Sequence, residues 1–454
     1  MTAGNLAWGG AIGTALGIAY AASPLSVWFA VVTFALFRWA CRGLAIEERR
    51  YVWAILTVSL TLKVYLITAM SLGSDPDIPS SFFWDGDGAY MKQRALMLSR
   101  IWSEVAVPSE DVFHVFDATY GWSAYLYVLA LLQYLTGPAP YGVHLFNVII
   151  FMAAAVALYR VARSAFGRAP ALFGLALMLF LPTLIAWSVS ALKESLFVFL
   201  FAASLWGAVT AARATRLRER LVGLALVAAS IAANGTVRPG ASMMMLAGLG
   251  LGLAAGLLVR RPPVLLVVLF CVLFGGLGLW QTPAVQGQVM SRLRTTAVLH
   301  MGTVRTEAPS YRILDQRMYS QPDGIATMTP AEGVRYALRA AITFLVAPLP
   351  WQVHSRSGLV FLPQQLIWYC LLALAAVGFA AGIRRDPLVS CLLVGLSAAC
   401  AAAIGLTNGN IGTMVRFRDW IVPLVVWLSA LGGTTLVSRL LSRVTPSQEV
   451  RLCP

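Results

Sequence analysis

Residues 74–122 gather the side chains that could carry proton-transfer chemistry. This stretch holds eight of the 19 acidic residues in a chain of 454, beside a run of aromatic residues. Carboxylates are costly in a membrane protein unless they have a role. The motif WDGDGAY places Asp85 and Asp87 two residues apart, with Tyr90 three further on. These types and this spacing favour a general base, or a carboxylate that orients a hydroxyl nucleophile.

A purely structural role fits the same motif equally well. Gly86 and Gly88 suit a turn, and a carboxylate at the start of the following sequence would interact with the N-terminus of a helix. The DGDG string is no EF-hand, because the remaining calcium-ligand positions are absent. The motif alone does not choose between Asp85 and Asp87 as the base.

A second acidic candidate and a candidate phosphate ligand are adjacent at the start of a later apolar run. Glu194 is the second acid, and Lys193 could pair with a phosphate. The alternative is that this charge pair simply marks the end of a membrane helix, with the lysine reaching toward water.

Three arginines are further candidates for binding phosphate. Arg238 lies in NGTVRPG, and Arg416 and Arg418 lie two residues apart in GNIGTMVRFRDW. A pair of guanidinium groups could clamp a diphosphate or a phosphodiester. The alternatives are a turn residue for Arg238 and a surface cluster of Arg418 with Asp419.

The segment 283–335 and the sequence after it carry weaker indications. FLVAPLPWQ could form a re-entrant edge on which a sugar stacks against Trp351. Most of the six arginines of the polar segment are expected to face solvent or anionic lipid headgroups: Arg292, Arg294, Arg305, Arg312, Arg317 and Arg335.

The composition predicts an all-α, polytopic integral membrane protein. Hydrophobic residues make up 59% of the chain, charged residues 12%, and the mean hydropathy is +0.76. The net charge of +15 is explained by arginines in short turns on the cytoplasmic side, so no nucleic-acid partner is implied. The cysteines and histidines lack metal-ligand spacing, and no motif for ATP, a dinucleotide or a zinc peptidase is present. No cofactor is therefore implied, except that a divalent metal on the carboxylates stays open.

The distribution of basic turns predicts about 12 transmembrane helices with both termini in the cytoplasm. In this topology two apolar segments, 119–136 and 336–350, do not cross and form interfacial or re-entrant pieces beside the two long outer loops. The expected spans are 7–22, 25–40, 53–73, 141–159, 170–188, 194–212, 219–234, 241–258, 264–281, 360–382, 387–406 and 420–437. All the candidate site residues then face the extracytoplasmic side.

The order of these features resembles that of the GT-C superfamily of membrane glycosyltransferases over residues 53–212. An outer loop with Asp-Gly and a tyrosine precedes the aromatic segment GWSAYLYVLALLQYLTG. A span ending in LYRVARSAFGR, a span with Pro182 and an acidic residue at the next outer turn follow. Protein O-mannosyltransferases, aminoarabinose transferases and oligosaccharyltransferase catalytic subunits belong to this superfamily.

The resemblance implies an inverting transfer of a sugar from a polyprenyl-phosphate-linked donor to a hydroxyl of a glycan, lipid or protein acceptor. It maps the first-loop aspartate to Asp87 or Asp85 and the second-loop acid to Glu194. Lys-Glu replaces the commoner Asp-containing motif there, which leaves metal dependence open. The expected location is the bacterial inner membrane, with the site on its outer face.

The same resemblance divides the chain into three regions. These are N-terminal helices over 1–52, a GT-C-like catalytic module over 53–212 with an acidic loop at 74–118, and a C-terminal transmembrane region over 213–454 with a loop at 283–358. Two other functions remain open. NxGTxxRxR is similar to polysaccharide-assembly membrane proteins, which favours a polymerase or ligase with a lipid-diphosphate donor. A lipid or solute transporter or flippase is the third possibility, although no internal repeat is present.

Overall fold

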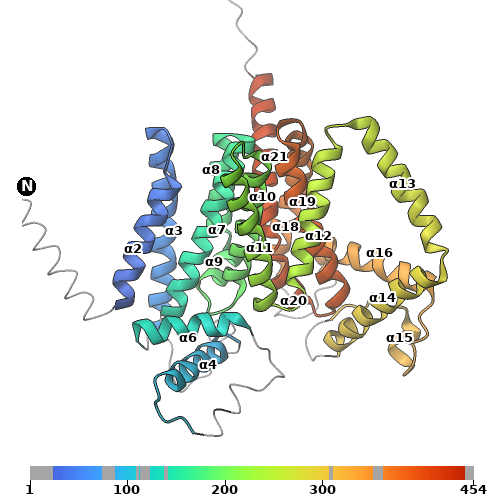
Figure 1. Ribbon diagram of the computed structural model, residues 1–454, viewed down its shortest axis with the longest axis horizontal. Coiled ribbons are helices and arrows are strands. Elements are labelled where there is room, and N and C mark those ends of the chain that lie inside the picture. Colours follow the sequence, from blue (N-terminus) through green and yellow to red (C-terminus); the bar gives the residue numbers. More distant parts are fainter. Residues whose placement is uncertain are drawn as a thin grey trace, which may run out of the picture. The chain divides into compact units, whose positions relative to one another are not determined.

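The described part of the chain is helical (Figure 1). The computed structural model describes residues 24–73, 87–108, 112, 123–137, 142–305, 310–350 and 361–444. Within these ranges the one strand-like pairing is an isolated antiparallel bridge between Ser310 and Asn410.

Nine helices in the described ranges are long and apolar enough to cross a membrane. Each coincides with a span expected from the sequence, which confirms the class of helical integral membrane protein. They are α3 (Ile46–Gly73), α7 (Gly142–Phe166), α10 (Glu194–Arg213), α11 (Leu217–Val237), α12 (Ala241–Leu258), α13 (Pro262–Trp280), α18 (Phe361–Arg385), α19 (Pro387–Thr407) and α21 (Val422–Val444).

A tenth span is formed if two bent helices are counted together. Helices α8 (Arg168–Phe180) and α9 (Pro182–Val189) meet at an angle of 59°. The bend falls at Pro182, which lacks a backbone N–H and cannot continue the helical hydrogen bonds. The pair occupies the expected span at 170–188.

The remaining expected elements are shorter. Helix α2 (Pro24–Ala40) has 17 residues, and the first expected span, 7–22, lies outside the described residues. The two segments expected not to cross contain α6 (Ala124–Thr136) and α16 (Pro330–Val346), and neither is among the helices suited to span a membrane. The count of 12 therefore stays a prediction.

The chain divides into two compact units, which we describe separately. Unit 1 comprises Met1–Val161 and Leu175–Ser242, and unit 2 comprises Ala162–Gly174 and Met243–Pro454.

Unit 1 contains a tightly packed helix pair, α10 and α11. A Cβ on Gly207 would lie 2.8 Å from the carbonyl oxygen of Gly223, and a Cβ on Gly223 would lie 2.7 Å from that of Gly207. Small residues at such crossings allow the two backbones to approach closely within a membrane. Helix α4 (Asp87–Trp102) packs on α6 at the lower end of this unit in Figure 1, whereas the α2–α3 connection lies at the upper end.

Helix α3 carries buried polar residues along one of its faces. Glu48, Ser59 and Lys63 are all buried on it. Glu48 accepts a hydrogen bond from the hydroxyl of Tyr159 at 2.7 Å, and the amine of Lys63 lies 4.8 Å from the centre of the Phe151 ring. Both contacts are made to α7, so side chains join α3 to α7 at two positions about four turns apart.

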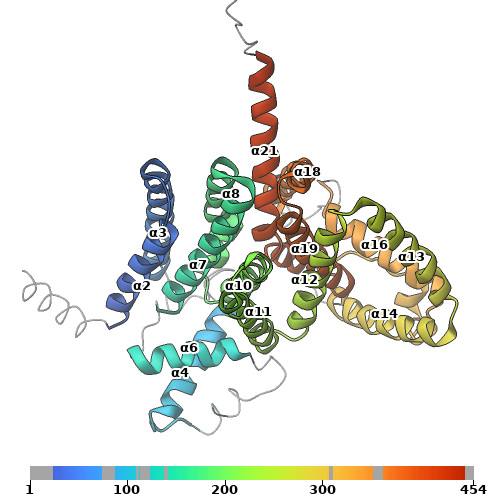
Figure 2. The same cartoon turned by 45° about the horizontal axis from the view of Figure 1, so that its top comes forward.

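Unit 2 is built around α18, α19 and α21 (Figure 2). Glycines again occupy the crossings: a Cβ on Gly378 would meet the carbonyl of Leu428, and a Cβ on Gly252 would lie 2.6 Å from the Cα of Leu392. The short helix α20 (Ile411–Arg418) precedes α21.

The polar segment expected over 283–335 is largely helical. It forms α14 (Pro283–Val304) and α15 (Gln316–Ser320), which pack with α16. Met290, Ala297 and Met301 follow one another at helical spacing and are buried against Tyr336 of α16. This apolar face seats α14 on α16, while Val298 and Leu299 on the rest of the helix are exposed.

Candidate active site

Helix α4 begins at Asp87, so the motif WDGDGAY leads into a helix N-terminus. Asp85 lies outside the described residues. A Cβ built on Gly88 would lie 3.7 Å from the Cβ of Ala191 and 3.9 Å from its backbone nitrogen. Ala191 belongs to residues 190–193, the connection between α9 and α10. The first turn of α4 therefore lies directly beside the segment that leads to Glu194.

The α9–α10 connection is held in place by an amide side chain of α7. The Nδ2 atom of Asn147 donates to the carbonyls of Ser190 at 2.6 Å and Leu192 at 2.8 Å. The hydroxyl of Tyr125 donates to Asn147 Oδ1 at 3.1 Å, and both side chains are fully buried. A ring nitrogen of His144 lies 2.7 Å from the carbonyl oxygen of Val189. Asn147 and His144 thus provide partners for backbone carbonyls at the end of α9 and in the connection after it.

Glu194 stands at the first position of α10 and is only 4% exposed. A helix N-terminus favours a negative charge. Burial raises the pKa of the Tyr125 hydroxyl, the hydrogen bond with Asn147 lowers it, and the charge of Glu194 raises it further. The carboxylate of Glu194 is thus within electrostatic reach of Tyr125. Lys193 immediately precedes Glu194 and is half-buried.

Arg238 lies at the same end of unit 1, where the preceding residue, Val237, is held by a hydrogen bond. It follows the last residue of α11, Val237, whose carbonyl accepts a hydrogen bond from the buried Ser123 hydroxyl at 2.7 Å. Ser123 in turn precedes the first residue of α6, the helix that contributes Tyr125. Hydrogen bonds and packing therefore connect the elements that carry Asp87, Lys193, Glu194 and Arg238.

Tyr90 lies on α4, one turn after Asp87, and is partly exposed. The guanidinium carbon of Arg94 is 4.2 Å from the centre of the Tyr90 ring, in a cation–π contact. Arg94 itself is buried. This arrangement fixes the tyrosine ring beside the first turn of α4.

Sequence reasoning missed Asn147 and His144, although both are central to this arrangement. They lie three residues apart in the apolar run GVHLFNVIIF, and so share one face of α7. Two polar residues on one face of a spanning helix are a recognisable pattern, since polar groups inside a membrane need partners.

Two of the predicted phosphate ligands belong to unit 2. Arg416 is half-buried in the last turn of α20. Arg418 is buried: its Nη1 donates to Gln365 Oε1 at 2.7 Å, and its Nη2 donates to the carbonyls of Thr343 at 3.3 Å and Phe344. Trp351 lies outside the described residues.

The environment of Arg418 indicates an anchoring role. Its guanidinium carbon lies 5.4 Å from the Phe344 ring centre and 5.5 Å from that of Trp368. Burial lowers the pKa of Arg418 to about 10, so the side chain stays charged near neutral pH. Arg418 joins α20 to α16 and α18, and its binding of phosphate stays a prediction.

The turn before α20 is fixed by a buried histidine in α14. His300 Nδ1 lies 2.8 Å from the carbonyl oxygen of Asn408, and His300 Nε2 lies 3.2 Å from the hydroxyl of Tyr319. The hydroxyl of Tyr311 donates to the same Asn408 carbonyl at 2.8 Å. Gly409 fits tightly here, because a Cβ on it would lie 2.9 Å from His300 Cε1.

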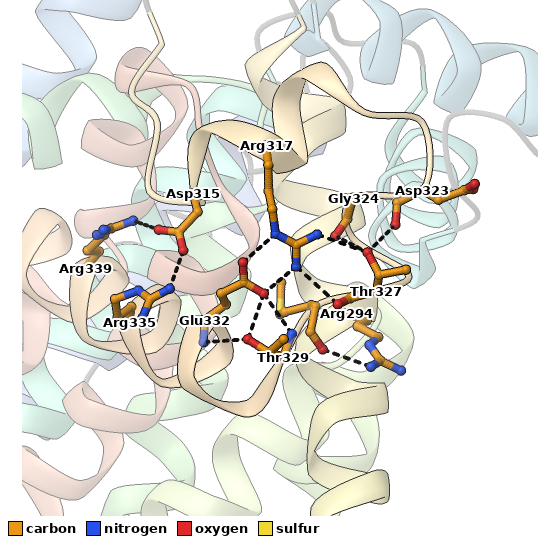
Figure 3. Close-up of polar contacts among 11 residues, drawn as sticks. Arg294, Asp315, Arg317, Asp323, Gly324, Thr327, Thr329, Glu332, Arg335 and Arg339 are labelled. Carbon is orange, nitrogen blue, oxygen red and sulfur yellow. Dashed lines mark hydrogen bonds and ion pairs between the residues drawn. The ribbon is translucent and has the colours of Figure 1, made fainter.

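Several arginines of the polar segment bind within unit 2 (Figure 3). Arg317 Nε donates to Glu332 Oε1 at 2.5 Å. The hydrogen bonds from Arg317 and, to a smaller extent, from Thr329 lower the pKa of Glu332 to about 2. Asp315 accepts from Arg335 and Arg339 at 2.6 Å each. Arg294 Nη2 donates to the carbonyl of Met328 at 2.9 Å. The side chains of Arg294, Arg317 and Arg335 therefore hold α14, α15 and α16 together, while Arg317 and Arg335 also remain partly exposed, as expected.

Neither a search for metal-binding groups nor comparison with known proteins assigns a function to these residues. Among the described residues, no group of three histidine, cysteine, aspartate or glutamate side chains could hold a metal ion. The acidic residues at 74–86, 109–111 and 113–122 lie outside that set. Comparison of the chain with protein-family models, curated proteins and solved structures finds no match.

Proposed function

We propose that the protein is a membrane glycosyltransferase of the GT-C type. It transfers a sugar from a polyprenyl-phosphate-linked donor to a hydroxyl of a glycan, lipid or protein acceptor. The observation that supports this proposal is the close approach of Gly88 to Ala191, since it brings the Asp87 end of α4 beside the segment leading to Glu194. Two acidic positions far apart in the sequence thereby belong to neighbouring segments at one end of unit 1.

The residues on these elements suit an inverting displacement. The acceptor oxygen attacks the anomeric carbon while the bond from that carbon to the phosphate oxygen breaks. The proton of the acceptor hydroxyl passes to the carboxylate of Asp87, and polyprenyl phosphate leaves. Lys193 and Arg238 stabilise the charge that develops on the departing phosphate.

The membrane setting explains how the donor is presented. A polyprenyl chain stays in the bilayer, so the enzyme needs no soluble domain for a nucleotide sugar. The proposal includes 12 crossings with both termini in the cytoplasm and places α4 and Glu194 on the outer face of the bacterial inner membrane.

A lipid-diphosphate donor, as used by a polysaccharide polymerase or ligase, is less well supported. The clamp expected for a diphosphate was the pair Arg416 and Arg418. The guanidinium of Arg418 is already bound by Gln365 and the carbonyls of Thr343 and Phe344.

The identity of the lipid that co-purifies with the protein tests the proposal. The full chain is purified in nanodiscs, its lipids are extracted and weighed by mass spectrometry, and transfer to hydroxyl acceptors is assayed with and without EDTA. A polyprenyl-monophosphate sugar and a new glycosidic bond are expected. A diphosphate-linked oligosaccharide would indicate a polymerase or ligase. Movement of a glycan lipid across vesicles without glycosidic bond formation would contradict the proposal.

A further inference from the structure

A pocket of about 840 Å³ lies at the α2–α3 connection of unit 1. In Figure 1 this connection is at the opposite end of unit 1 from α4 and α6. None of the residues proposed for sugar transfer lines it. Its walls are formed by Phe34, Ala35, Arg38, Trp39, Cys41, Arg42, Gly43, Arg49 and Trp53.

The lining changes from charged to apolar with depth along the two helices. Arg38 and Arg42 flank the end of α2 at Ala40, and Arg49 lies in the first turn of α3. Phe34 lies six residues before the end of α2 and Trp53 seven residues into α3, which is about 10 Å deeper at 1.5 Å per residue. Charged groups at the end of a spanning helix and aromatic groups below them match the polarity of a membrane boundary.

Two arginines of the pocket have no partner in the part of the chain that the structure describes: the guanidinium groups of Arg38 and Arg42 form no hydrogen bond or ion pair there. Among the described residues, no acidic side chain lines the pocket. The first turn of α3 carries Glu47 and Glu48, of which Glu48 is buried and accepts from Tyr159. The sequence of residues 1–23 contains no acidic residue.

The backbone that carries these arginines is held firmly. Nη1 of Arg160, on α7, donates to the carbonyls of Trp39 at 2.9 Å and Arg42 at 3.1 Å. The Trp39 ring packs edge-on against Trp206, with ring centres 5.5 Å apart. Because the turn is fixed by contacts from other helices, its arginines are presented in a defined place before any ligand binds.

We propose that this pocket binds an anionic phospholipid from the membrane leaflet at the α2–α3 end of unit 1. The lipid phosphate lies among Arg38, Arg42 and Arg49, and the upper part of its acyl chains lies against Phe34, Ala35 and Trp53. A basic pocket beside spanning helices is suited to an acidic headgroup. The pocket volume is within the range of sites for small ligands.

Native mass spectrometry of the full chain tests this site. The detergent-purified protein is titrated with phosphatidylglycerol, with phosphatidylcholine carrying the same acyl chains, and with inorganic phosphate. The test variant is R38Q/R42Q. The matched control is R216Q/R218Q, which removes the same charge from exposed residues of another turn in unit 1.

The wild type and the control are expected to retain one phosphatidylglycerol and to bind phosphatidylcholine weakly. R38Q/R42Q should bind phosphatidylglycerol roughly 30-fold more weakly, as expected for two arginines near an anionic lipid. Ala35→Phe, which fills the apolar part of the pocket and keeps every arginine, should also weaken binding.

Three results would overturn the site. Equal losses in R38Q/R42Q and R216Q/R218Q would show diffuse surface charge. Equal retention of phosphatidylglycerol and phosphatidylcholine would show that the headgroup charge plays no role in binding. Displacement of phosphatidylglycerol by an equal concentration of inorganic phosphate would show a phosphate site without a lipid-chain contribution.

Discussion

Gly88 faces Ala191 across a gap that a single methyl group would fill, since a Cβ on Gly88 would be 3.7 Å from the Cβ of Ala191. Gly88→Ala should therefore be tolerated. Gly88→Leu should push α4 away from the α9–α10 connection and lower the rate of sugar transfer by up to roughly 100-fold. The control is Gly302→Leu, because a Cβ at Gly302 would meet nothing within 4 Å. A wild-type transfer rate in Gly88→Leu would show that this close approach does not position the site.

Asn147 should be required for stability as well as for activity. Asn147→Leu leaves the buried carbonyls of Ser190 and Leu192 without a donor, at about 1–3 kcal/mol for each stranded group. Tyr125→Phe removes one donor to Asn147 Oδ1 and should cost less. Thermal unfolding in nanodiscs measures both. Equal destabilisation by the two variants would contradict the assigned hydrogen bonds.

Variants of Arg418 and Arg416 should differ in stability, which distinguishes a structural role from phosphate binding. Arg418→Ala removes the donor to Gln365 and to two carbonyls and should lower the free energy of unfolding by about 3 kcal/mol or more. Arg416→Ala should cost much less, since Arg416 is half-buried. If Arg418→Ala unfolds like the wild type but no longer binds the donor lipid, its main role is phosphate binding.

His300 should make the stability of unit 2 sensitive to acid. Burial lowers the pKa of His300 from its usual value near 6.5, against the opposing effect of the Asn408 carbonyl. Tyr319 already accepts hydrogen bonds from the backbone nitrogens of Ile313 and Leu314, so a protonated His300 would find no free acceptor there.

The sign of this effect follows from proton binding. Below about pH 6.5 the unfolded chain takes up a proton that the folded chain does not, so the unfolded state gains stability. The contribution of His300 is complete above that pH and is lost as the pH falls through the folded-state pKa. The melting temperature of the wild type should fall between pH 7.5 and 5 by more than that of His300→Asn. Identical pH profiles would contradict this role.

The membrane helices could be predicted from the sequence because each depends on a local apolar run. The bend between α8 and α9 is equally local, since it falls at Pro182. The prediction treated 283–335 as a polar segment because its arginines dominate the composition. The helix α14 is instead stabilised by Met290, Ala297 and Met301, which find their apolar partners in α15 and α16.

The candidate site was only partly predictable for the same reason. Charged positions such as Asp87, Glu194 and Arg238 stand out in an apolar sequence. The side chains that fix them, Asn147 and Ser123, act on backbone carbonyls 43 and 114 residues away. Which carbonyl a buried side chain reaches depends on tertiary packing, and a single sequence does not contain that information.

The most direct test of the proposed function is the sugar-transfer rate of Asp87→Asn, with full chain reconstituted in liposomes and polyprenyl-phosphate sugar as donor. Asp85→Asn is assayed in parallel, and Glu104→Gln, in an exposed position of the same acidic stretch, is the charge-matched control. Asp87→Asn should unfold at the wild-type temperature and lose transfer by roughly 100-fold or more, the usual contribution of a general base. Full transfer activity in both Asp87→Asn and Asp85→Asn would contradict the account.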